Sequence, residues 1–186
     1  MSLLDLTKEA ENRMKKTVES TQSEFNTIRT GRASPSILDN IVADYYGSPT
    51  PVNQLATISV PESRQLLITP YDRGAVAAIE KAIKNSDINI NPVNDGSSLR
   101  LSIPPLNEER RRDFVKVLSK KAEEGRVSIR NIRRDTNDHY KGLVKKSEAS
   151  EDDSKRAQEQ LQKLTDKYVA EVDHIAKVKE AELMEV

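Results

Sequence analysis

Residues 102–111 read "SIPPLNEERR", and the pair Pro104 and Pro105 in this stretch marks the point where the chain changes character. Proline breaks helix interiors, because it lacks the backbone N–H and clashes with the preceding turn. All eight prolines lie between Pro35 and Pro105, whereas the first 34 residues and the last 81 have none. The sequence therefore predicts two helical ends and a middle of different structure.

Apolar residues recur at steps of three and four in both proline-free ends, as in helices with one buried face. The first stripe runs from Leu3 to Ile28, the second from Leu118 to Leu143, and the third from Leu161 to Val178. Asn107 and Ser150 are the predicted N-caps of the second and third helices, since their side chains accept hydrogen bonds from first-turn amides. Three long helices with narrow apolar faces predict an antiparallel three-helix bundle.

The middle of the chain predicts a small α/β domain, which makes the whole protein an α+β protein of two domains. Residues 37–72 contain short β-rich runs broken by Gly, Pro, Asn and Ser. Residues 73–86 have the period of an amphipathic helix, and Asn94-Asp95-Gly96 between two extended runs is a hairpin signal. The expected layers are those of a β/α/β sandwich.

This domain is inserted between the first and second helices, so two strands of chain connect it to the bundle. The predicted bundle comprises residues 1–29 and 106–186, and the predicted insert comprises residues 30–105. Hinges are expected near 29–31 and 103–106, where Gly31 is the conformationally permissive residue.

Charge is balanced in total, at 30 basic and 30 acidic residues, but it is segregated along the chain. Residues 110–146 contain thirteen Lys or Arg against five Asp or Glu, a net charge of +8. Residues 147–186 contain six basic and eleven acidic residues, a net charge of −5. The sequence thus predicts a basic second helix beside an acidic third helix.

Arg126, Arg130, Arg133 and Asn137 follow one another at steps of four, three and four, so they line one flank of the second helix. One interpretation is a solvated flank whose arginines pair with acids of a neighbouring helix. The other is a surface for RNA or another polyanion, since the planar guanidinium suits phosphate recognition and base stacking. The residues alone leave both interpretations open.

The sequence gives no sign of an enzyme or of a metal site. It has no phosphate-binding loop and no nucleophile elbow. His139 and His174 have no partner at metal-ligand spacing, and the acids of "SEDD" (150–153) suit a helix start better than a calcium loop. No cysteine is present, and the N-terminus resembles neither a signal peptide nor a membrane span, so a cytoplasmic protein is expected.

Several long segments carry a specific pattern: "RTGRASPSILD" (29–39), "YYGSPTPVNQLA" (45–56), "NDGSSLRLSIPPLNEERR" (94–111) and "RNIRRDTND" (130–138), together with "SEDD". In these segments the chain resembles the ribosome recycling factor family. The resemblance implies an L-shaped molecule with the dimensions of transfer RNA. It also implies a non-enzymatic factor that splits the post-termination ribosome into subunits together with elongation factor G and GTP.

The same resemblance implies that the bundle lies against large-subunit ribosomal RNA across the tRNA sites. The family's RNA-contacting arginines match Arg110, Arg130 and Arg133, with Arg29 and Arg32 as further candidates. Its hinge matches Thr30, Gly31, Pro104 and Pro105. The RNA-binding candidates also include Arg126, on the flank of the second helix, and Arg134, which follows Arg133 in the sequence.

The factor itself is expected to need no cofactor, because GTP is used by the elongation factor. It is also expected to be a monomer and to have no membrane partner. Residues 30–105 contain six basic and seven acidic residues, so this domain suits protein contacts better than RNA. A helical adaptor that binds an acidic protein surface through its arginines is the alternative. Steep salt dependence of ribosome binding would favour the RNA interpretation.

Overall fold

The structure, a computed structural model, describes residues 1–185 and divides them into two compact units. One unit comprises Met1–Ile28 and the chain from Arg111 onward, and the other comprises Arg29–Arg110. These divisions fall one and five residues from the expected ones. Helical ends around a small sheet-containing unit confirm the predicted α+β, two-domain class.

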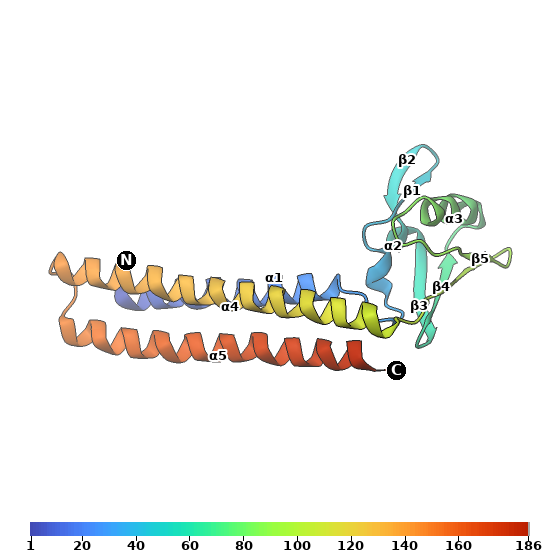
Figure 1. The fold of residues 1–186 in the computed structure, drawn as a ribbon. Coiled ribbons are helices and arrows are strands. Elements are labelled where there is room, and N and C mark those ends of the chain that lie inside the picture. The colour runs from blue at the N-terminus through green and yellow to red at the C-terminus, as the bar shows by residue number, and fades with distance from the viewer. Residues whose placement is uncertain (186) are drawn as a thin grey trace. The chain divides into compact units, whose positions relative to one another are not determined.

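The larger unit is built from three long helices, α1 (Leu3–Asn26), α4 (Glu108–Lys145) and α5 (Glu151–Met184) (Figure 1). Both predicted caps are confirmed. The amide of Arg110 donates to Asn107 Oδ1 at 2.8 Å, and the amide of Asp153 donates to the Ser150 hydroxyl at 3.1 Å.

The three helices form an antiparallel bundle in which α4 runs opposite to α1 and α5 (Figure 1). Two buried tyrosines fix the helices against each other through hydroxyl contacts. Tyr140 of α4 is hydrogen-bonded to Thr7 of α1, and Tyr168 of α5 donates to Glu11 Oε1 of α1 at 2.9 Å. These contacts join residues far apart in the chain, so they specify the axial register of the bundle.

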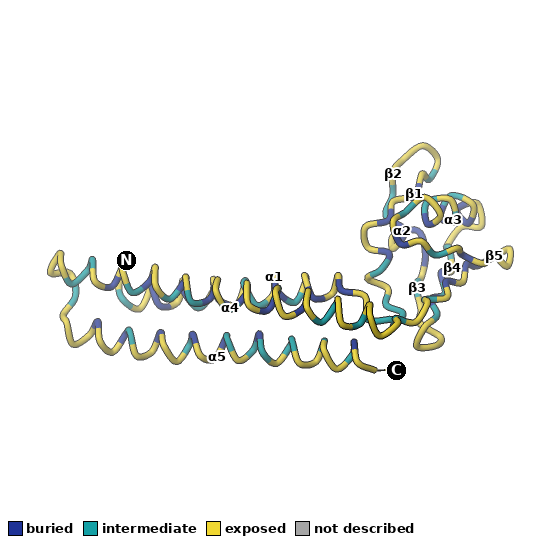
Figure 2. Tube along the Cα trace, viewed as in Figure 1, coloured by how far each residue is buried: buried dark blue, intermediate teal, exposed yellow. Residues whose placement is uncertain are grey.

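The buried positions follow the predicted stripes over most of their length, and differences appear toward the ends of α4 and α5 (Figure 2). On α4 the stripe from Leu118 to Thr136 is continued by the fully buried Tyr140, whereas Leu143 is only half-buried. On α5 the prediction for Val178 is wrong, because its side chain is 48% exposed while Leu183 is buried. The spacing of apolar residues does not show where two helices cross. Near the end of α5 the residues that face the bundle no longer include Val178.

Gly125 permits close packing between α4 and α1. A Cβ atom at this position would lie 2.7 Å from Thr21 Oγ1 and 3.3 Å from Thr21 Cγ2. Thr21 cannot easily turn away, since it is buried and its hydroxyl donates to the Thr17 carbonyl at 2.8 Å. The glycine therefore serves the helix contact, although it lowers the intrinsic helix propensity of α4.

The smaller unit contains two antiparallel sheets, a single-turn helix and one longer amphipathic helix. A two-stranded sheet pairs β1 with β2, and a four-stranded sheet has the order β3-β4-β6-β5. Its strands and helices are β1 (Val42–Tyr45), β2 (Ser48–Pro51), α2 (Val52–Leu55), β3 (Ala56–Glu62), β4 (Gln65–Pro70), α3 (Val76–Lys84), β5 (Val93–Asn94) and β6 (Leu99–Ser102). A 3₁₀ turn at Pro35–Leu38 and another at Arg73–Ala75 complete it.

The core of this unit is apolar and continuous between the sheets and α3. Its fully buried members include Leu38, Leu66, Ile68, Ile79, Ile83, Leu99 and Leu101. The predicted helix at residues 73–86 is confirmed as α3 with its preceding turn. The predicted hairpin is also confirmed, because β5 and β6 pair antiparallel around Asp95, which accepts hydrogen bonds from the Ser98 amide and hydroxyl.

Gly125→Ala should destabilise the bundle although alanine favours helix. Overpacking against Thr21 lowers the free energy of unfolding by about 1–3 kcal/mol, and the higher helix propensity of alanine offsets about 1 kcal/mol of this. Urea unfolding of Gly125→Ala, Thr21→Ala and the double variant would measure the coupling between these positions. We expect Gly125→Ala to be tolerated better in the Thr21→Ala background, and strictly additive effects would contradict the steric contact.

Tyr168 should make the bundle sensitive to alkaline pH. Burial, together with the hydrogen bond to Glu11, raises the pKa of Tyr168 to about 12. A tyrosine in an unfolded chain titrates near pKa ~10, so this stabilisation is fully present below pH ~10 and is lost as the pH rises through about 12.

Tyr168→Phe should therefore lose less stability than the wild type between pH ~8 and ~11.5, by on the order of 1–2 kcal/mol. Urea unfolding of both proteins at several pH values would test this. Equal losses in the two proteins would show that the pKa of Tyr168 is the same in the folded bundle as in the unfolded chain, which would contradict the raised pKa.

Candidate nucleic-acid interface

The predicted arginine flank lies on the side of α4 that faces α5. We call Arg126, Arg130, Arg133 and Asn137 the α4 ridge. Two arginines of the ridge contact α5, one at the start of the ridge and one further along it. Arg126 Nε donates to Asp173 Oδ1 at 2.6 Å, and Arg133 Nη1 donates to Gln162 Oε1 at 3.0 Å. The ridge is thus bordered by a second helix rather than surrounded by solvent.

Arg126 is neutralised by two carboxylates. Besides Asp173, its Nη1 lies 2.9 Å from Glu123 Oε2, and its side chain is only 25% exposed. Burial lowers the pKa of Arg126, but the hydrogen bonds to Asp173 and Glu123 outweigh burial and raise it. The pairing interpretation of the sequence therefore describes Arg126 well.

Arg133 differs from Arg126 in the chemistry of its partner. Gln162 is neutral, so this hydrogen bond orients the guanidinium without cancelling its charge. Arg130 is intermediate, since its Nη1 lies 3.6 Å from Glu123 Oε1 and its side chain is 42% exposed. The positive charge available on the ridge is therefore concentrated at Arg130 and Arg133.

Two further residues extend this part of α4. Arg134 is exposed and has no ion pair within residues 1–185. Asn137 carries a buried Oδ1 atom for which the described part of the chain offers no hydrogen-bond partner. Arg134 thus adds a second unpaired charge next to Arg133.

The other predicted arginines are not members of the ridge. Arg110 is exposed and stands in the first turn of α4, twenty residues and more than five helical turns before Arg130. Arg29 is exposed, and its Nη2 lies 3.5 Å from the Asp87 carbonyl oxygen. Arg32 is also exposed, and its amide donates to the Thr30 hydroxyl at 3.4 Å. All three belong to the smaller unit.

The predicted hinge residues come together within the smaller unit. Gly31 has φ +78°, and a Cβ atom there would lie 3.4 Å from the Leu106 backbone nitrogen and 4.0 Å from Pro105 Cα. Both connections to the bundle therefore pass close to each other at Gly31. The positive φ supplies the reason for glycine at this position.

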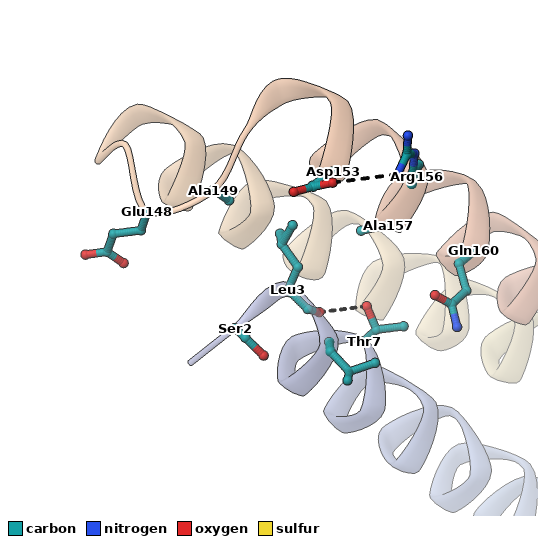
Figure 3. A pocket seen from close by; sticks show the side chains of 10 residues that line it. Ser2, Leu3, Thr7, Glu148, Ala149, Asp153, Arg156, Ala157 and Gln160 are labelled. Carbon is teal, nitrogen blue, oxygen red and sulfur yellow. Dashed lines mark hydrogen bonds and ion pairs between the residues drawn. The ribbon is translucent and has the colours of Figure 1, made fainter.

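One further pocket lies in the bundle, away from the ridge. A pocket of about 420 Å³ opens at the end of the bundle where the α1 N-terminus meets the α4–α5 turn (Figure 3). Leu3, Leu4 and Thr7 of α1 line it opposite Asp153, Arg156, Ala157 and Gln160 of α5. The exposed pair Arg156–Asp153 spans 4.0 Å. His139 and His174 are exposed.

Among the residues described, no group of His, Cys, Asp or Glu is arranged to hold a metal ion. No helix within residues 1–185 is long and apolar enough to cross a membrane.

The sequence could not identify the partners of the ridge. Asp173 and Gln162 lie 47 and 29 residues from the arginines they contact. Their roles depend on the rotation of α5 about its axis, which an acid-rich sequence does not specify. The only available signal was the net acidity of residues 147–186, which left the pairing interpretation open for the whole flank and could not distinguish Arg126 from Arg133.

Comparison with known proteins gives a consistent result. The family model described as "Ribosome recycling factor" matches residues 21–184. A ribosome-recycling factor of Carboxydothermus hydrogenoformans is 56% identical over 182 residues, covering 98% of each chain. One from Legionella pneumophila (strain Paris) is 52% identical with the same coverage.

Two solved structures are similar over the whole chain. A solution structure of the ribosome recycling factor has a TM-score of 0.80 and 47% identity, covering 100% of this chain and 99% of that one. The second, from models of the T. thermophilus ribosome recycling factor and the E. coli elongation factor G bound to the E. coli post-termination complex, has a TM-score of 0.69. Its identity is 44%, with 100% of both chains covered.

Proposed function

This chain belongs to the ribosome recycling factor family, a family of non-enzymatic translation factors, and we propose that it splits post-termination ribosomes into subunits together with elongation factor G and GTP. The relative bound with elongation factor G to a post-termination complex supports this role. The factor needs no cofactor of its own, since GTP is used by the elongation factor, and it acts as a monomer. Its bundle anchors it on large-subunit ribosomal RNA across the tRNA sites.

The observation that carries the anchoring role is the contrast between Arg126 and Arg133 of the α4 ridge. Arg126 faces two carboxylates, whereas Arg133 faces an amide and keeps its charge. A charged guanidinium that already points along a helix flank is suited to bidentate contact with phosphate. Arg130 and Arg134 add further positive charge beside it. In this role Arg126 is a structural residue that joins α4 to α5.

The smaller unit serves a different purpose in this proposal. Six basic and seven acidic residues leave residues 30–105 almost neutral, so they offer RNA little electrostatic attraction. We assign this unit to contacts with elongation factor G and to the movement that separates the subunits. The connections at Thr30, Gly31, Pro104 and Pro105 allow that movement.

Arg133→Gln should weaken ribosome binding more than Arg126→Gln. Both variants remove one positive charge from the same helix flank, so their long-range effects match. Loss of a phosphate contact at Arg133 costs about 1–3 kcal/mol, roughly 5- to 150-fold in affinity, and lowers the salt slope by about 1. Loss of Arg126 should change affinity less than about threefold, because no contact to RNA is lost.

Titration of labelled protein with ribosomes at several salt concentrations would measure these differences. Light scattering of post-termination ribosomes with elongation factor G and GTP would then show whether splitting falls in proportion to binding. Equal losses for the two variants would contradict a specific contact at Arg133. Binding with little salt dependence would favour an adaptor that recognises protein.

The hinge assignment can be tested at Gly31. Proline cannot adopt φ +78°, so Gly31→Pro would disturb the fold as well as the movement. Gly31→Ala strains the same backbone, whereas Gly31→Asn is a matched control, because asparagine tolerates positive φ better than alanine does. We expect Gly31→Ala to retain ribosome binding within about twofold and to slow splitting, with Gly31→Asn closer to the wild type.

Stopped-flow light scattering would give the splitting rates, and circular dichroism would confirm that both variants are folded. Parallel losses of binding and splitting in folded Gly31→Ala would show that anchoring and movement are not separable at this residue.

A further inference from the structure

We propose that Gln162 is a positioning residue for Arg133, holding its guanidinium in the orientation that contacts RNA while leaving its charge intact. This inference rests on the proposed function, in which Arg133 contacts ribosomal RNA. It assigns a role in RNA binding to α5, the acidic helix, whose composition argues against such a role.

The geometry around Gln162 fixes both ends of its amide group. Its Oε1 accepts from Arg133 Nη1 at 3.0 Å, and its Nε2 donates to Asp166 Oδ1 at 2.9 Å. Asp166 stands one helical turn further along α5, so its carboxylate turns the amide oxygen toward α4. The three residues form a chain of hydrogen bonds that ends on the guanidinium.

Asp166 contributes orientation without neutralising Arg133. Within residues 1–185 these two side chains form no ion pair, because the amide of Gln162 stands between them. The opposite arrangement is present on the same flank of α4. There Asp173 contacts Arg126 directly at 2.6 Å, and Glu123 completes the neutralisation.

Holding Arg133 in advance favours binding for a physical reason. A free arginine side chain loses rotamer freedom when it contacts a phosphate, and a restrained one has already lost much of it. A carboxylate would restrain the side chain equally well, but it would have to be displaced, or would repel the phosphate, on binding. An amide restrains the guanidinium at no electrostatic cost.

Two substitutions separate these effects. Gln162→Met has similar length but accepts no hydrogen bond, so Arg133 becomes mobile and keeps its charge. Gln162→Glu keeps the acceptor and adds a negative charge 3.0 Å from Arg133 Nη1. Because Gln162 is exposed, both variants should unfold within about 2 °C of the wild type.

Ribosome affinity would be measured at several salt concentrations for the wild type, Gln162→Met and Gln162→Glu. The same three proteins would also be measured with Arg133→Gln added. We expect Gln162→Met to bind about three- to tenfold more weakly with an unchanged salt slope. Gln162→Glu should bind more than about tenfold more weakly, with the slope lower by about 1. In the Arg133→Gln background both effects should fall below about twofold.

A second measurement needs no ribosome. In ¹⁵N NMR spectra of the free protein, the Arg133 guanidinium should show hindered rotation in wild type and Gln162→Glu, and free rotation in Gln162→Met. A merely structural role of Gln162 would leave this signal unchanged.

Two results would overturn the proposal. The first is that Gln162→Met and Gln162→Glu both bind ribosomes with wild-type affinity, although Arg133→Gln binds more weakly. The second is that the Gln162 substitutions weaken ribosome binding as much in the Arg133→Gln background as in the wild type. If Arg133→Gln itself binds as tightly as wild type, then the RNA contact of the proposed function fails, and the positioning role fails with it. The three results are distinct, so a failure of the positioning role can be told apart from a failure of the proposed function.

Discussion

The polar side-chain contacts between α4 and α5 are the interactions on which the ridge depends. Helix α4 has 38 residues and one narrow apolar face, and most of the stability of such a helix in a protein comes from packing that face against its neighbours. Helix α1 has 24 residues and covers only part of that length, whereas α5 has 34. Both neighbours support α4, through Thr21 and Thr7 of α1 and through Asp173 and Gln162 of α5, and the helix that neutralises Arg126 is the acidic α5.

That coupling creates a conflict which individual side chains resolve. If every residue of α5 facing the ridge were acidic, the bundle would gain ion pairs of modest value and lose its charge for RNA. The structure shows a division instead, with Asp173 opposite Arg126 and Gln162 opposite Arg133. One arginine is used to hold the helices together, and another is left available. Net charge per segment cannot reveal this division.

Features that depend on local sequence were predictable. The caps Asn107 and Ser150, the apolar stripes, the helix after Arg73 and the hairpin at Asp95 each follow from neighbouring residues. Features that depend on how helices rotate against one another were not. The exposure of Val178 and the burial of Tyr140 belong to this second class, as do the partners of the ridge. The candidate arginines came from spacing and resemblance together, and only packing separates Arg126 from Arg133.

The register of the bundle has a mechanical consequence. Thr7 and Glu11 of α1 are hydrogen-bonded to tyrosines of α4 and α5, and several turns later Thr21 lies against Gly125 where no side chain intervenes. Sliding α1 by one residue would break the hydroxyl contacts. The same movement would also press a side chain of α1 against the α4 backbone at Gly125. The three helices therefore respond to a load along their axes as one stiff strut, which transmits force from end to end without internal slip.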